Sequence, residues 1–174
     1  MKNTILAGLI AVAIAPLMAN ASDGTITFKG EVTANTCTVK INDGAATNTV
    51  TLPTVTSSQL AAAGDTAAPT EVRIGLSECS TAVKSARAFF EAGPNVTAAT
   101  NNLKNNGTAT NVEVQLLTPS NAAIKIGDTS QRSDAAVALA SGSALLKYSA
   151  QYYATGASTA GTVDTSVTYS IDYL

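Results

Sequence analysis

The chain of 174 residues is long enough to bury one hydrophobic core; 13% of its residues are charged, and its formal net charge at pH 7 is −2. A nucleic-acid partner is excluded on this composition, because no basic patch is available to neutralise phosphates. The sequence contains no histidine, which excludes Ser-His-Asp and Cys-His catalytic sites.

The first residues have the three parts of a secretory signal. Lys2 supplies a charge, an apolar run follows from 5 to 18, and Ala19-Asn20-Ala21 has the small-x-small pattern of a signal-peptidase site. The apolar run is shorter than the ~20 residues that a membrane-spanning helix needs. We therefore predict a signal peptide over 1–21, cleaved between Ala21 and Ser22.

The rest of the chain has the composition and the patterning of an all-β domain. Thr and Val favour strands, whereas Gly, Asn and Ser mark turns. Alternating apolar and polar residues predict short strands separated by turn signals, which indicates a sandwich. In chain order we expect strands at 26–32, 37–41, 50–52, 72–76, 86–91, 112–116, 124–126, 145–154 and 163–173, with one helical turn at 57–63.

Two cysteines follow the predicted signal peptide, Cys37 and Cys79. An even count in an exported chain points to a disulfide. Such a bridge would contribute roughly 4 kcal/mol in the chain-entropy account. The alternative is a pair of free reactive or metal-binding thiols, but no histidine is present to work with them.

The C-terminal stretch has one apolar face. Its odd positions are mostly apolar or aromatic and its even positions are all polar. One interpretation is an ordinary core strand that secures the C-terminus, where chains usually fray. The odd positions are Val163, Thr165, Val167, Tyr169, Ile171 and Tyr173.

A second alternating segment precedes the first cysteine. Its apolar face has a glycine near the centre, a residue that often marks close approach of another backbone. The pattern alone leaves two interpretations equally open: a strand of the chain's own sheet, or a strand added to an exposed edge of another molecule. The residues on this face are Ile26, Phe28, Gly30 and Val32.

Several motifs, in order and spacing, resemble major pilins of the type 1 fimbrial family, which are assembled by the chaperone–usher route. They are Phe28-Lys29-Gly30-Glu31-Val32 followed by Cys37-Thr38-Val39, then Ala109 to Gln115, Tyr152-Tyr153-Ala154-Thr155-Gly156, and a terminal signature of Gly161 with a penultimate Tyr173. The resemblance covers nearly the whole chain after the signal peptide. The departures are Leu174 as last residue and an Asn-rich stretch, 101–106, without an assigned role.

The resemblance implies an incomplete immunoglobulin-like sandwich that lacks its last strand and is completed by a donor strand from a neighbouring subunit. It divides the chain into a signal peptide at 1–21, a donor extension at 22–34 and a pilin domain at 35–174. The implied donor residues are Ile26, Phe28, Gly30 and Val32. The implied groove and chaperone-contact residues are Gly161, Val163, Val167, Tyr169, Ile171 and Tyr173.

The implied function is a structural subunit of a fimbria that supports cell adhesion, exported through the periplasm to the cell surface. The implied partners are neighbouring copies in a homopolymer, a periplasmic chaperone and an outer-membrane usher. A minor adaptor or tip-proximal subunit is the alternative, because it has the same parts. A sugar-binding adhesin would carry an additional receptor domain, which this chain has no room for.

We expect no enzymatic activity, cofactor or metal. No glycine pattern links a strand to a helix as phosphate binding requires. Asp128 and Asp134 flank a polar loop, but their spacing is not that of a calcium-binding loop.

Overall fold

The computed structural model describes residues 37–174, which form an all-β domain. Within this range no helix is long and apolar enough to cross a membrane. The predicted cleavage site between Ala21 and Ser22 lies outside the described residues. So do the predicted donor residues, Ile26, Phe28, Gly30 and Val32.

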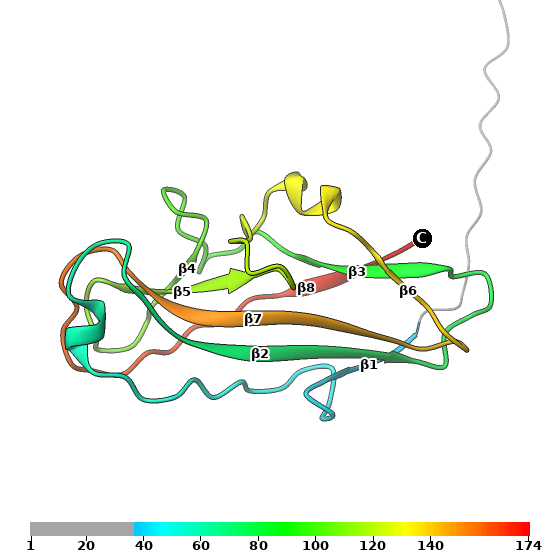
Figure 1. Ribbon diagram of the computed structural model, residues 1–174, viewed down its shortest axis with the longest axis horizontal. Helices are drawn as coiled ribbons and strands as arrows, with labels where there is room; N and C mark the ends of the chain where they lie inside the picture. Colours follow the sequence, from blue (N-terminus) through cyan, green and yellow to red (C-terminus); the bar gives the residue numbers. More distant parts are fainter. Residues whose placement is uncertain (1–36) are drawn as a thin grey trace, which may run out of the picture. The chain divides into compact units, whose positions relative to one another are not determined.

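The larger of the two sheets in this part of the chain has five antiparallel strands in the order β1-β2-β7-β5-β4. Its long central strands, β2 and β7, lie side by side in Figure 1. The bounds are Thr38–Ile41 for β1, Thr66–Ser77 for β2, Ala144–Ala154 for β7, Val112–Leu117 for β5 and Leu103–Lys104 for β4.

The smaller sheet has the order β6-β3-β8 and is also antiparallel. Its strands are β6 at Val137–Ala138, β3 at Ser85–Phe90 and β8 at Tyr169–Tyr173. In Figure 1, β8 (red) runs beside β3 (green) toward the C-terminus. Among residues 37–174 the smaller sheet therefore ends at β8, which has a strand neighbour on one side only.

The main hydrophobic core lies between the sheets, and a smaller cluster includes Leu60 and Tyr152. The alternation of each strand sends every second side chain inward, and the cluster draws on both sheets. Phe90 packs edge-on against Tyr148, with ring centroids 5.2 Å apart. Phe89 points to the other face, where the Arg132 guanidinium covers its ring at 4.2 Å. Core members include Ile74, Leu76 and Leu146 from the larger sheet and Ala86, Ala88 and Phe90 from the smaller one.

Strand β2 is longer than the predicted 72–76, because its pairing continues past a β-bulge near the start of the strand. The pairing with β7 shifts register between Ala67 and Thr70. Pro69 lies in this gap, where no ladder hydrogen bond is needed, and Ala68 has a positive φ of 54°. Bulges of this kind bend a strand without ending it.

Two short 3-10 helices connect the strands. The first, η1 at Ser57–Leu60, occupies the first half of the predicted helical turn and buries Leu60. The second, η2 at Thr129–Ser133, buries Gln131. The amide of Gln131 accepts from the backbone N–H of Phe90 and donates to its carbonyl, both at 3.0 Å. This pair of bonds holds η2 against the end of β3.

Three predicted strands differ in the structure. Residues 50–52 and 124–126 are not strands, because neither segment has a continuous strand neighbour in the described part of the chain. The predicted strand at 163–173 forms regular structure only at 169–173, as β8. Upstream of Tyr169 the chain contacts loops and side chains instead of a strand.

Candidate functional site: a groove beside the C-terminal strand

Strand β8 has one free edge. Ser85 and Leu174 exchange two backbone hydrogen bonds of 3.0 and 2.9 Å, and the N–H of Glu91 donates to the carbonyl of Thr168. Because hydrogen-bonding groups alternate between the two sides of a strand, even residues of β8 bond to β3. The N–H and C=O groups of the odd residues point the other way and have no hydrogen-bond partner within residues 37–174: Val167, Tyr169, Ile171 and Tyr173.

The same alternation continues upstream of β8. The N–H of Asn106 donates to the carbonyl of Asp164 at 2.8 Å, and the N–H of Ala109 donates to that of Thr162 at 3.0 Å. The even residues are thus bonded to the loop at 105–109. The backbone groups of Val163 and Thr165 lack a partner among the described residues, so the free edge extends from 163 to 173.

A groove runs along this free edge. Its larger part, of about 810 Å³, lies between the segment at 47–52 and the segment at 163–167. Its second part, of about 620 Å³, lies between 54–57 and 158–163. The two parts share Tyr152 and Val163, so they are adjacent stretches of one groove. Apolar side chains dominate the floor of the larger part: Val72, Phe90, Leu103, Val114, Leu116, Tyr148, Ala150 and Tyr152.

The opposite wall of the groove is also an unpaired edge. Val50, Leu52 and Val55 are half-buried, whereas the residues between them are exposed. The backbone groups of residues 50–55 make no hydrogen bond to the rest of the described chain. Unpaired backbone N–H and C=O groups thus line both sides of the groove, and an apolar floor lies between them. An added β-strand requires both features.

The phenol of Tyr148 lies in the floor of the groove. The hydroxyl of Tyr148 accepts a hydrogen bond of 3.0 Å from the N–H of Ala88, and burial raises the pKa of Tyr148, so the phenol stays neutral at physiological pH. The Oγ1 atom of Thr165 is buried without a partner in the described structure. Within residues 37–174 no three acidic or cysteine side chains gather as metal ligands.

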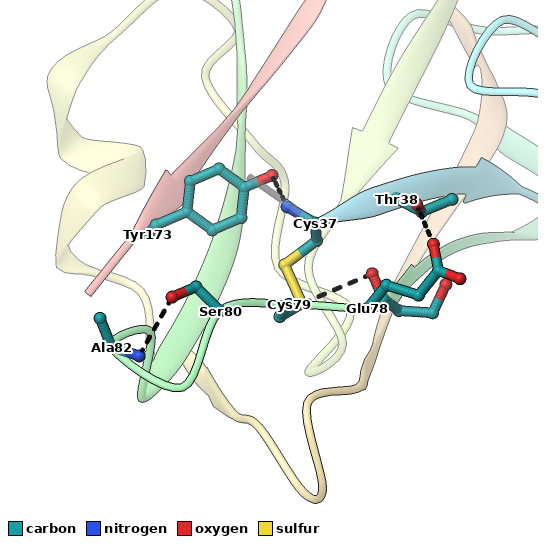
Figure 2. Close-up of a disulfide and its surroundings, with 8 residues drawn as sticks. Cys37, Thr38, Glu78, Cys79, Ser80, Ala82 and Tyr173 are labelled. Carbon is teal, nitrogen blue, oxygen red and sulfur yellow. Dashed lines mark hydrogen bonds between the residues drawn. A yellow bond between two sulfur atoms is a disulfide. The ribbon is translucent and has the colours of Figure 1, made fainter. Parts of the chain in front are cut away.

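Two tyrosines tie β8 to the first described segment of the chain. The hydroxyl of Tyr169 donates to the carbonyl of Ala46 at 2.8 Å. The N–H of Cys37 makes a longer contact, 3.4 Å, with the hydroxyl of Tyr173. Figure 2 shows the Tyr173 hydroxyl directed at Cys37 beside its disulfide. The groove lining ends at Val167, just before these contacts.

The predicted disulfide between Cys37 and Cys79 is present. It joins the start of β1 to the chain just after β2. These strands are neighbours, with Thr38 paired to Ser77. The bridge therefore anchors the chain at the point where the predicted donor extension would leave the domain.

The structure brings the predicted groove residues to one face but gives them different positions. Val163 and Val167 line the groove, Tyr169 and Tyr173 contact the segment at 37–46, and Ile171 packs on the core. Nothing in the structure tests their contact with a chaperone, which stays a prediction.

Gly161 has a steric role. A Cβ there would lie 2.7 Å from the Cα of Ala109, closer than atoms can pack. Gly107 is similar, because its Cβ would lie 2.6 Å from the carbonyl carbon of Thr162. These two glycines let the loop at 105–109 and the C-terminal segment approach closely enough to exchange backbone hydrogen bonds.

The sequence predicted a strand at 50–52 but not its place as the opposite wall of the groove, and it gave no role to the loop that supports the free edge. The apolar residues Val50, Leu52 and Val55 were a usable signal for the wall. The Asn-rich stretch offered no such signal for its contacts with Thr162 and Asp164, because these residues are more than fifty positions away.

Comparison with known proteins places the chain in a class of fimbrial structural subunits. The family model for FimA, type-1 fimbrial protein A, matches residues 52–174. The chain is 43% identical to the major fimbrial subunit SMF-1 of Stenotrophomonas maltophilia (strain K279a) over 169 residues, 92% of this chain and 98% of that protein. It is 39% identical to the F17 fimbrial protein of Escherichia coli over 161 residues, 88% of each.

Solved structures share the fold. A subunit of a chaperone–usher pilus matches with a TM-score of 0.62 at 21% identity, over 92% of this chain and all of that one. The P pilus rod subunit PapA matches with a TM-score of 0.60 at 16% identity, over 79% of this chain and 99% of that one. The chain belongs to the type-1 fimbrial protein family and is a structural pilin subunit. Subunits of this family polymerise with neighbouring pilins as surface appendages.

Proposed function

We propose that the chain forms the shaft of a surface fimbria by strand donation, in which the segment at 22–34 of one copy fills the groove beside β8 of the next. The observation that carries the proposal is the free edge at 163–173, whose part at 163–167 faces a second unpaired edge across an apolar floor. A strand laid between them would give the smaller sheet the neighbour that β8 lacks.

The donor segment has the complementary pattern. Ile26, Phe28, Gly30 and Val32 alternate with polar residues, so the four lie on one face of an extended strand. Each apolar side chain contributes about 1.5–3 kcal/mol when fully buried, and backbone hydrogen bonds on both sides add to this. Ordering the donor offsets part of the gain.

The same geometry gives a reason for another protein to occupy the groove before assembly. An exposed edge above an apolar surface is an aggregation hazard before assembly. We propose that a periplasmic chaperone occupies the groove first, and that an outer-membrane usher directs its exchange for the next copy's donor segment. The contact strand for the chaperone would be Val163 to Tyr173, and the product would be a homopolymer at the cell surface.

Deletion of Ser22 to Val32 tests the proposal. If the segment is donated, the deletion variant should be a folded, chaperone-bound subunit that accepts a donor but cannot extend the fibre. Electron microscopy should then show few or short fibres. Adding a synthetic peptide of Ser22 to Thr33 should release the chaperone and leave a soluble monomer. An unfolded, degraded deletion product would show that the segment belongs to the chain's own fold.

A further inference from the structure

The wall of the groove at 162–166 is held by side chains where a sheet would have a strand. Residues 169–173 bond to β3, but no strand lies next to 162–166 in the described structure. Thr108 and Ala109 bond to Thr162 at one end of this wall. The other contacts come from three asparagines, Asn95, Asn105 and Asn106, here called the asparagine clamp.

Asn105 is the centre of the clamp. Its Oδ1 accepts from the N–H of Asp164 at 2.9 Å and from that of Gly107 at 2.8 Å. Its Nδ2 donates to the carbonyl of Thr162 at 3.2 Å and to that of Ala109 at 2.8 Å. Both halves of the amide are therefore used, and one side chain fixes two residues of the groove wall.

Asn95 holds the next residue of the wall. Its Nδ2 donates to the carbonyl and the hydroxyl of Ser166 at 3.1 and 3.0 Å. Its Oδ1 accepts from the Nδ2 of Asn106 at 3.0 Å, while the backbone N–H of Asn106 bonds to Asp164. The clamp thus contacts Thr162, Asp164 and Ser166 from the two segments that flank β4.

The clamp, together with the bonds of Thr108 and Ala109 to Thr162, fixes the direction in which the unpaired groups of the wall point. With the even residues Thr162, Asp164 and Ser166 bonded on the loop side, the N–H and C=O groups of Val163 and Thr165 must face the free edge. If the even residues turned, the groups that would pair with an incoming strand would turn as well.

We infer that Asn105, assisted by Asn95, is a positioning residue for strand donation: it presents the backbone of Val163 and Thr165 to the donor segment of a second copy. This inference rests on the proposed function. A clamp with a purely structural role would stabilise the loop and the wall without affecting how tightly the donor segment is held.

Hydrogen exchange measured by mass spectrometry on fibres assembled from the full chain separates the two roles. Asn105→Ala removes the whole amide, and Asn105→Asp removes only its donors. Asn111→Asp is the matched control: it removes a similar donated bond of 2.9 Å, to the carbonyl of Ala157, away from the free edge. Asn111 has a positive φ of 56°, which Asp also tolerates.

We expect both Asn105 variants to speed exchange in peptides covering 22–34 by about tenfold, while Asn111→Asp leaves these peptides unchanged. Asn95→Ala removes the contacts to Ser166 and should give a smaller rise, which keeps the test available where Asn105 variants assemble poorly. Faster exchange at 103–109 and 162–166 with unchanged protection at 22–34 would overturn the inference. Absence of protection at 22–34 in unaltered fibres would instead overturn the proposed function.

Discussion

Truncation of Val167 tests whether the groove is filled in the fibre. Val167 lines the groove and is half-buried without a donor. Val167→Ala removes two methyl carbons, each worth about 0.8 kcal/mol when buried. If a donor covers the site, the loss is about 1.6 kcal/mol per joint, a little more than tenfold in the equilibrium for subunit release. If no donor covered Val167, the substitution would cost only a fraction of this free energy.

The neighbouring Thr168 gives a matched control, because its side chain is exposed and lies on the opposite face of the strand. Fibres of Val167→Ala and Thr168→Ala would be held at one guanidinium concentration, and released subunits quantified after sedimentation. We expect release about tenfold greater for the Val167 variant and unchanged for the Thr168 variant. Equal release by the two variants would refute the reasoning that the odd face is buried by a donor.

Three further changes test the supports of the groove. Replacing Cys37 and Cys79 together by Ala opens a loop with a sequence separation of 42 and should lower the free energy of unfolding by about 4 kcal/mol; an unchanged guanidinium midpoint would contradict this. Tyr169→Phe removes the hydroxyl bond to the first loop and should cost about 0.5–1.5 kcal/mol in the same assay, whereas no loss would mean that the bond contributes nothing. Gly161→Ala places a methyl group against the backbone of Ala109 and should cost about 1–3 kcal/mol; fibres with unaltered thermal stability would exclude the close approach.

The apolar face of the C-terminal segment was predictable because a period of two needs only the local sequence. Val163, Val167 and Ile171 all lie half-buried toward the core, as their alternation with polar residues indicates. The length of the strand was not predictable in the same way. Regular structure starts only at Tyr169, because a strand requires a neighbour, and no neighbouring strand lies beside 163–168 in the described structure.

The start of β2 and the contacts of the asparagine clamp could not be predicted from the sequence, for related reasons. Pro69 inside a strand argues against a strand on sequence grounds, and only the register shift in the pairing with β7 accommodates it. Asn105 looked like a turn residue, which it also is, since its Oδ1 accepts from Gly107. Its bonds to Thr162 and Asp164 depend on the packing of distant segments.

We expect the groove beside β8 to hold a strand from another copy of the chain in the fibre. A cryo-electron microscopy map of the assembled fibre, at a resolution that separates side chains, tests this most directly. We predict a strand between β8 and the segment at 50–55, with side-chain density fitting Ile26, Phe28 and Val32, none at Gly30, and a connection to the neighbouring subunit's Cys37. An empty groove, or a strand connected to the same subunit, would contradict it.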